Sequence, residues 1–198
     1  MADPIDNAKR ALRAELRERR QLLTEAARRD AESGITTQLN ALVQATGARS
    51  VSCYLSTRTE PGTRAFVRAA TERGIRVLLP ITRVDGLLDW AVADPDGELV
   101  EGLLGMPEPA GDLLGPIAVG EVDLMIIPAA AVDRTGMRLG WGRGYFDKTI
   151  GSMQDGPPVY AVVYDTELVD EVPRDVHDQP VGGVVTPTRT VTLAPQRR

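Results

Sequence analysis

"SVSCYLS" (residues 50–56), "TRAFVRAATERG" (63–74) and "IRVLLP" (75–80) follow one another along the chain. The first and third segments are short apolar runs, which is typical of buried strands. The middle segment has a helical pattern, with Thr63 as a candidate N-cap and Gly74 as a candidate stop. A strand–helix–strand order favours two parallel strands joined by a right-handed crossover. The stretch therefore predicts an α/β fold built on a parallel sheet.

The remaining apolar segments extend this sheet. "VDLMIIP" (122–128), "PVYAVVYD" (158–165) and "GGVVTP" (182–187) predict three further strands. "LLDWAVAD" (87–94) and "ELVEG" (98–102) flank the turn "PDG", which indicates a hairpin excursion. "MPEPAGDLLGPIA" (106–118) is predicted to be a Pro/Gly-rich loop. We expect one compact domain over residues 1–198, with a mostly parallel central sheet flanked by helices.

Two helices precede the sheet. Asp3 and Pro4 fit an N-cap and the first position of a basic helix over residues 4–21, which is expected to pack on the α/β core. Its apolar stripe is expected at helical spacing, with basic residues on the other faces: Ile5, Ala8, Leu12 and Leu16. A second helix is expected to begin near Thr24 and to turn four apolar residues inward: Ile35, Leu39, Leu42 and Val43.

Composition excludes several classes of protein. The net charge of −5 argues against nucleic acid or an anionic membrane as the main partner. A single cysteine, Cys53, excludes an intrachain disulfide framework and a Cys-rich zinc site, and its apolar surroundings indicate core packing. The chain shows no secretory signal and no apolar run long enough to span a bilayer. We expect a cytoplasmic monomer that binds small molecules.

"RLGWGRGYFD" (138–147) is the most unusual stretch, because its glycines stand at alternate positions before a short helix, "YFDKTIGSM". Exposed backbone N–H groups ahead of a helix favour phosphate binding. The loop lacks the Lys and Ser/Thr of a Walker A motif. Its G-x-G-x-G spacing, set back from the strand, also departs from the dinucleotide fingerprint, although Asp165 stands about where a ribose-binding acid would. Dinucleotide binding and a plain surface loop remain alternatives.

The supply of catalytic residues is small. The chain has no G-x-S-x-G elbow, and His177 is its only histidine. A site with a phosphate loop, arginines and acids but no marked nucleophile favours phosphoryl transfer, which depends on positioning and charge neutralisation. Asp147 and Asp178 are the candidate ligands for Mg²⁺, which takes one or two carboxylates together with phosphate oxygens.

"PAAAVDRTGMRLGWGRGYFD" (128–147) resembles the signature of the 5-formyltetrahydrofolate cyclo-ligases, also called methenyltetrahydrofolate synthetases. Further segments resemble this family in the same order: "AKRALRAEL" (8–16), "YLSTRTEPGT" (54–63), "GMPEP" (105–109) and "VPRDVHDQPVGGVVTP" (172–187). Two positions depart from the family pattern, which usually has Tyr where Phe146 stands and Asp where Gly182 stands.

The resemblance implies an enzyme that uses ATP and Mg²⁺ to convert 5-formyltetrahydrofolate into 5,10-methenyltetrahydrofolate, releasing ADP and phosphate. In the implied mechanism the formyl oxygen attacks the γ-phosphate, N10 closes the ring and phosphate leaves. The family fold is a compact α/β domain, in agreement with the element order above. The alternative is a catalytically quiet relative that binds folate or nucleotide and acts as a regulator.

Residue roles also follow from the resemblance. It implies that Asp147 and Asp178 bind the metal. It implies ATP binding by the first helix and the glycine loop: Lys9, Arg10, Arg13, Arg138, Gly140, Trp141, Gly142, Arg143, Gly144, Tyr145 and Phe146. Within that set we expect catalytic roles for Arg138, Arg143 and Tyr145. It implies folate binding by Leu55, Glu60, Trp141, Gly142, Arg143, Gly144 and Tyr145.

Overall fold

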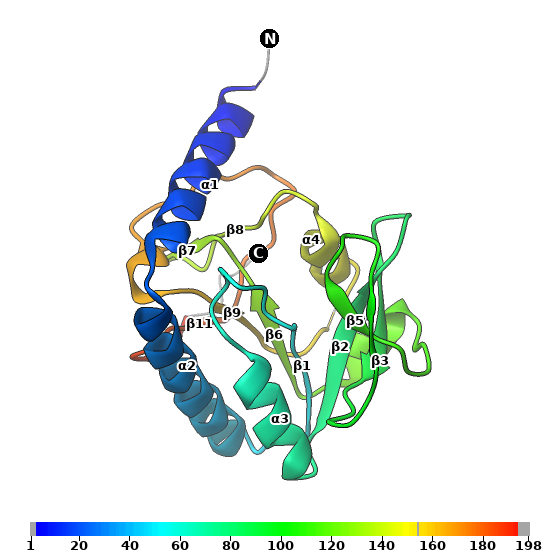
Figure 1. The fold of residues 1–198 in the computed structure, drawn as a ribbon. Coiled ribbons are helices and arrows are strands. Elements are labelled where there is room, and N and C mark those ends of the chain that lie inside the picture. Colours follow the sequence, from blue (N-terminus) through cyan, green and yellow to red (C-terminus); the bar gives the residue numbers. More distant parts are fainter. Residues whose placement is uncertain (1–2, 154, 194–198) are drawn as a thin grey trace.

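The computed structural model describes residues 3–153 and 155–193. Its centre is a seven-stranded sheet in the order β12-β11-β9-β6-β1-β2-β3 (Figure 1). In chain order these strands are β1 (Ser50–Ser52), β2 (Arg76–Thr82), β3 (Leu88–Val92), β6 (Leu124–Pro128), β9 (Val159–Val162), β11 (Gly183–Val185) and β12 (Thr190–Thr192). All neighbouring strands from β11 to β2 are parallel, and only the edge strands β12 and β3 are antiparallel. The mostly parallel sheet is confirmed.

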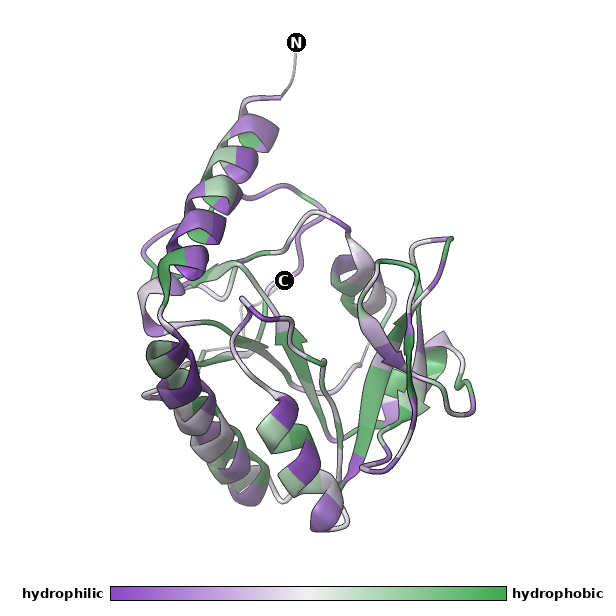
Figure 2. Ribbon diagram, in the orientation of Figure 1, coloured by the Kyte–Doolittle hydropathy of each residue, from purple (hydrophilic) through white to green (hydrophobic). Residues whose placement is uncertain are grey.

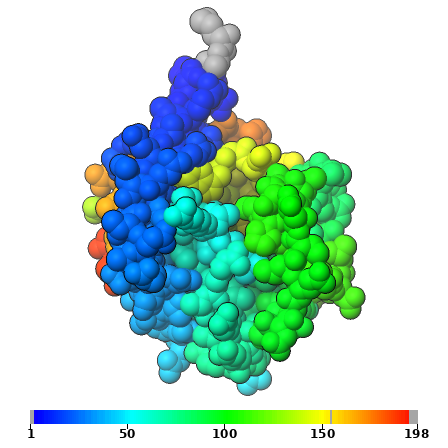
Figure 3. Space-filling view, viewed as in Figure 1, coloured from blue at the N-terminus to red at the C-terminus, as the bar shows by residue number. Residues whose placement is uncertain are grey.

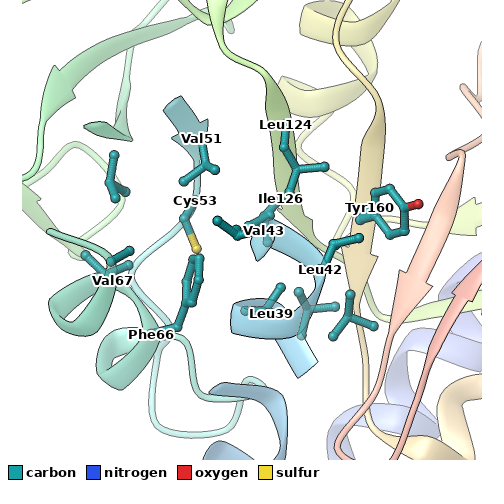
Figure 4. Close-up of a cluster of buried hydrophobic side chains, with 14 of the residues drawn as sticks. Leu39, Leu42, Val43, Val51, Cys53, Phe66, Val67, Leu124, Ile126 and Tyr160 are labelled. Carbon is teal, nitrogen blue, oxygen red and sulfur yellow. The ribbon is translucent and has the colours of Figure 1, made fainter. Parts of the chain in front are cut away.

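Two helices cover one face of this sheet, α2 (Glu25–Thr46) and α3 (Arg64–Glu72). Thr24 caps α2 by accepting a hydrogen bond from the Ala27 N–H. The predicted inward residues of α2 are all buried and pack with Phe66 of α3 against the strands (Figure 4). Cys53 lies in this cluster with 1% of its surface exposed, and burial raises the pKa of its thiol to about 12. The prediction that Cys53 packs in the core is confirmed.

The opposite face packs against α4 (Tyr145–Gly151) and the segments before β6. A small sheet lies beyond it, formed by β7 (Ala131–Asp133), β8 (Arg138–Leu139) and β10 (Leu168–Val169). The first helix, α1 (Pro4–Leu22), packs on that small sheet through Leu16. Figure 2 shows the result as apolar strands inside and mixed helices outside.

The inward face of α1 differs from the predicted one. Its start at the Asp3 N-cap is confirmed, since the Asp3 carboxylate accepts from the Ile5 N–H. However, Ile5 is 38% exposed, and the residues that α1 buries are Lys9, Leu16 and Arg20. The predicted stripe is confirmed for Leu16 and for Leu12, which packs beside it, and is wrong for Ile5 and Ala8, which are exposed. Lys9 and Arg20 are buried as well because each is paired with a carboxylate elsewhere in the fold, which offsets the cost of burying them.

The predicted hairpin across "PDG" is also wrong. β3 pairs with β2, whereas the second segment forms β4 (Leu99–Glu101) and pairs with β5 (Pro107–Pro109). Trp90 in β3 is 1% exposed, so joining the main sheet buries an aromatic side chain that an isolated hairpin would leave in water. The segment expected to be a loop, residues 106–118, contains β5 and the start of the 3₁₀ turn η1 (Pro116–Glu121). β1 is shorter than expected, ending at Ser52.

Within the described ranges, none of the helices has the length and apolar character needed to cross a membrane.

Candidate active site

The strand order places a crevice between β1 and β6. The chain runs from β1 to β2 on one side of the sheet and from β6 through β9 to β11 on the other, so the winding reverses between these two neighbours. In open α/β sheets, ligands bind outside the carboxyl ends of the strands at this reversal. A cavity of about 470 Å³ lies there, lined by Leu55 and Glu60 after β1, Thr82 at the end of β2 and Pro128 at the end of β6. In Figure 3 the segments around its opening are α1 and α2 in blue, loop 53–60 in cyan, the β4–β5 hairpin in green and the glycine loop in yellow.

Charges of both signs line this cavity. The cations come from α1 and the glycine loop: Arg17, Arg20, Arg138 and Arg143. Glu60 and Glu108 line it from the loop after β1 and from β5, and Asp147 lines it from α4. The cavity can therefore accept a ligand that carries both anionic groups and N–H donors.

The glycine loop is built around a buried ion pair. Arg138 is 3% exposed, and its Nη2 donates to Asp147 Oδ1 at 2.6 Å. Burial lowers the pKa of the Arg138 guanidinium, opposed by the nearby carboxylates of Asp147 and Asp178. At Gly140 a Cβ would lie 3.0 Å from the Arg138 guanidinium, so the missing side chain makes room for this cation. Gly142 has a φ of +92°, a conformation that favours glycine.

A second buried ion pair ties α1 to the opposite side of the site. Arg20 Nε and Nη2 donate to the two carboxylate oxygens of Glu167 at 2.6 and 2.8 Å, and Nη2 also donates to the Ala129 carbonyl. The guanidinium stacks over the rings of Trp141 and Tyr164, 4.9 and 5.4 Å from their centroids. Bidentate pairing and stacking both depend on the planar guanidinium, so Arg20 fixes the position of Trp141 in the glycine loop.

Three donors around the cavity are buried without a partner in the part of the chain that the structure describes: Arg20 Nη1, Arg138 Nε and Trp141 Nε1. All three residues line the cavity, and they come from α1, from β8 and from the glycine loop. An unpaired buried donor costs about 1–3 kcal/mol. The wall of the cavity therefore carries a local energetic cost.

The predicted ATP-binding residues of α1 do not line the cavity. Lys9 Nζ pairs with Asp178 Oδ2 at 2.6 Å, and Arg13 Nε donates to the Gly140 carbonyl at 2.7 Å. Arg10 is exposed. Lys9 and Arg13 thus reach the predicted metal-binding acid and the glycine loop, and neither is among the residues that line the cavity.

Most of the other predicted residues do line the cavity: Leu55, Glu60, Arg138, Gly140, Trp141, Arg143, Gly144, Tyr145, Phe146 and Asp147. Gly142 and Asp178 do not. The Tyr145 hydroxyl donates to the Arg83 carbonyl at 3.1 Å, and Glu60 Oε2 accepts from the Thr57 N–H at 2.8 Å. Gly182 lies beside Val159, at the amino end of β9, and so is remote from the carboxyl edge that carries the site. Asp165, the candidate ribose-binding acid, accepts instead from the hydroxyls of Thr186 and Thr188.

Sequence reasoning missed three charged residues that line the cavity, Arg17, Arg20 and Glu108. Arg20 follows Leu16 by four residues, and this spacing places it on the same, inward face of the helix. That spacing could have identified it as buried. Glu108 was assigned to an aperiodic loop, and no local pattern marked it as buried.

Asp147 and Asp178 are carboxylates, the ligand type that hard cations prefer, and each is in an ion pair, with Arg138 and with Lys9. In the described ranges, no group of three or more His, Cys, Asp or Glu side chains is placed to hold a metal ion. Asp147 and Asp178 both lie close enough to Arg138 to act on its pKa. Two carboxylates completed by phosphate oxygens match the way Mg²⁺ is bound with nucleotides.

The molecule is thus an α/β protein with a cavity lined by arginines and carboxylates where the winding of the sheet reverses. The chain matches the model of the 5-formyltetrahydrofolate cyclo-ligase family over residues 5–187, and it belongs to that family.

Similar proteins agree with this assignment. The chain is 36% identical over 189 residues to a 5-formyltetrahydrofolate cyclo-ligase of Mycolicibacterium smegmatis, covering 93% of this chain and 96% of that protein. It is 30% identical to the enzyme of the same name from Escherichia coli K12, covering 88% and 97%. The solution structure of Aquifex aeolicus 5,10-methenyltetrahydrofolate synthetase superimposes with a TM-score of 0.79 at 25% identity, covering 96% and 95%.

Proposed function

We propose that this enzyme converts 5-formyltetrahydrofolate into 5,10-methenyltetrahydrofolate with ATP as co-substrate and Mg²⁺ as the required metal, releasing ADP and phosphate. The observation that carries the proposal is the cavity at the reversal of the sheet winding, which is lined by four arginines and by the carboxylates of Glu60, Glu108 and Asp147. Triphosphate oxygens would pair with the cations, and the N–H donors of a pterin would pair with the acids. The reaction is inferred from family membership. The charges that line the cavity indicate which residues bind ATP and which bind folate.

Arg138 and Arg143 stabilise the negative charge that develops on the phosphoryl group during its transfer. Arg138 is rigid because it is buried and paired with Asp147, and Arg143 is exposed at the cavity. Fixed cations beside a transferring phosphoryl group stabilise the transition state without reorganisation. The formyl oxygen attacks the γ-phosphate, N10 then attacks the activated formyl carbon, and phosphate leaves with the oxygen. Tyr145, held through the Arg83 carbonyl, lines the cavity beside these groups.

The roles of the remaining residues follow from their positions. Lys9 and Arg13 keep α1 against the glycine loop and bring positive charge to the phosphates. Glu60 binds the pterin by accepting hydrogen bonds from its N–H groups, and Leu55 binds it through apolar contact. Asp147 and Asp178 would hold Mg²⁺, which neutralises phosphate charge when bound.

We further propose that residues 1–198 form a single domain that acts as a cytoplasmic monomer on small molecules, with no nucleic acid or membrane partner. The net charge of −5 supports the absence of polyanionic partners. The packing of α1 on the small sheet supports a single unit, because its Leu16 shares one core cluster with β7 and β8.

The test is the near-ultraviolet absorbance of the methenyl product, recorded with each of ATP, Mg²⁺ and 5-formyltetrahydrofolate omitted in turn. Product should form only when all three are present. Arg143→Met should slow the reaction at saturating substrates, whereas the matched control Arg134→Met should not, because Arg134 pairs on the surface with Asp170. Product formation without ATP, or none with all three, would overturn the proposal.

A further inference from the structure

Glu108 is a buried acid that the mechanism above does not use. It lies on β5, is 6% exposed and lines the cavity. In the described part of the chain it takes part in no ion pair, whereas Asp147, Asp178 and Glu167 each do. Burying a carboxylate without a cation is costly unless hydrogen-bond donors satisfy it.

The donors present satisfy one oxygen of this carboxylate. Thr82 donates twice to Oε1, from its backbone N–H at 3.0 Å and from Oγ1 at 2.7 Å. The carboxyl group packs against Gly102, where a Cβ would overlap it. Among the described residues the hydrogen bonds to Glu108 fall on Oε1, which leaves Oε2 able to accept another one. Thr82 thus sets the orientation of the carboxylate, and Oε2 can accept a hydrogen bond from a ligand in the cavity.

The substrate of the proposed function has more N–H donors than Glu60 can accept. One carboxylate meets the exocyclic amine and the adjacent ring N–H of a pterin bidentately. A reduced pterin carries a further ring donor, the N8–H, which stays unmatched by that pair. Glu60 and Glu108 line the same cavity from different elements, the loop after β1 and the hairpin strand β5.

We propose that Glu108 Oε2 accepts the N8–H of the reduced pterin, so that the ring is held between two carboxylates. The inference rests on the proposed function and deepens it. It also assigns a role to the β4–β5 hairpin: the hairpin carries the acid that selects a reduced ring, because a fully oxidised pterin has no N8–H.

Glu108→Gln tests this contact without changing shape. Because the two Thr82 donors require an acceptor, they hold the amide oxygen, and the amide NH₂ then faces the ligand. The amide NH₂ of the variant and the N8–H of the pterin would then face each other as two donors, and no hydrogen bond would form. The Kd for 5-formyltetrahydrofolate, measured by calorimetry without ATP, should rise about 5- to 150-fold. The Kd for ATP should stay the same. Glu101→Gln is the matched control, since Glu101 is an exposed acid on the same hairpin, and its folate affinity should equal that of the wild type.

An 8-deaza analogue of 5-formyltetrahydrofolate, with CH₂ in place of N8–H, separates binding from a structural role. Wild type should bind it about 5- to 150-fold more weakly than the parent compound, and Glu108→Gln should bind the two nearly equally. Equal binding by the wild type would overturn the inference even if the variant failed to fold. A Glu108→Gln variant that binds folate normally, or that weakens folate and ATP alike, would overturn it too. Failure of the wild type to bind 5-formyltetrahydrofolate would instead overturn the proposed function.

Discussion

Arg20→Met should strongly destabilise the enzyme, because it leaves the Glu167 carboxylate buried without its cation. The two side chains are 2% and 4% exposed and are joined by two hydrogen bonds. Breaking a buried pair by removing one partner typically costs about 3–5 kcal/mol. For a chain of this size that corresponds to a fall in Tm of about 6–20 °C. Methionine keeps most of the apolar volume, so the loss reports on charge more than on a cavity.

The pair can be isolated by a double-mutant cycle measured by urea denaturation. Glu167→Gln alone should also destabilise, and Arg20→Met with Glu167→Gln should cost less than the sum of the single changes. Burial already raises the pKa of Glu167, and Arg20 opposes that rise. Removing Arg20 raises the folded-state pKa further above its unfolded value. Above about pH 4.5 the unfolded chain releases the Glu167 proton more readily than the folded protein does, so the raised folded-state pKa lowers stability. The stability lost in Arg20→Met should therefore shrink as the pH falls toward 4.5.

A loss of less than about 1 kcal/mol in Arg20→Met, the typical value for an exposed ion pair, would show that the Arg20–Glu167 pair contributes little to stability. Strict additivity in the cycle would do the same, as would a penalty that does not change between neutral and acid pH. The exposed pair Arg19–Glu15 serves as the control, since its side chains are 58% and 52% exposed and Arg19→Met should be nearly neutral.

Three further predictions concern the ligands. Glu60→Gln should weaken 5-formyltetrahydrofolate binding about 5- to 150-fold and leave ATP binding unchanged, measured by separate titrations; the reverse pattern would contradict the pterin role. Lys9→Ala should raise the KM for ATP more than the KM for folate, and Lys9→Arg should rescue it only in part, since a planar fork replaces a point charge; equal changes in both KM values would count against phosphate binding. Asp147→Asn should lower kcat most at limiting Mg²⁺, because it removes a proposed metal-binding carboxylate, and it should also lower the Tm, because it removes the charge paired with buried Arg138; near-normal kcat at limiting Mg²⁺ would show that Asp147 serves the ion pair alone.

The fold was predictable from sequence where apolar pattern and burial coincide. The strand–helix–strand stretch 50–80 and the strand "VDLMIIP" both show this pattern, and their parallel pairing followed from the order of elements. Pairing of short strands was not predictable, because β3 and β4 are adjacent in sequence but pair with different partners. Burial of Trp90 at the sheet edge, a long-range effect, decided that pairing.

The site was predictable where it lies in one continuous segment. The glycine loop and Glu60 were identified from sequence and do line one cavity. Arg20 and Glu108 were missed because each is buried through a partner far along the chain, Glu167 or Thr82. A charged residue looks exposed in a sequence pattern until its partner is known, so the inward face of α1 was assigned to the apolar residues instead.

In the proposed reaction, the formyl oxygen of the substrate attacks the γ-phosphate of ATP within this cavity. 5-Formyltetrahydrofolate labelled with ¹⁸O in the formyl group tests it directly, with mass analysis of the phosphate released in a single turnover. The label should appear in inorganic phosphate, because the bond that breaks last is the one between the formyl carbon and that oxygen. Unlabelled phosphate formed together with the methenyl product would show that water attacks ATP instead, and the proposed reaction would be wrong.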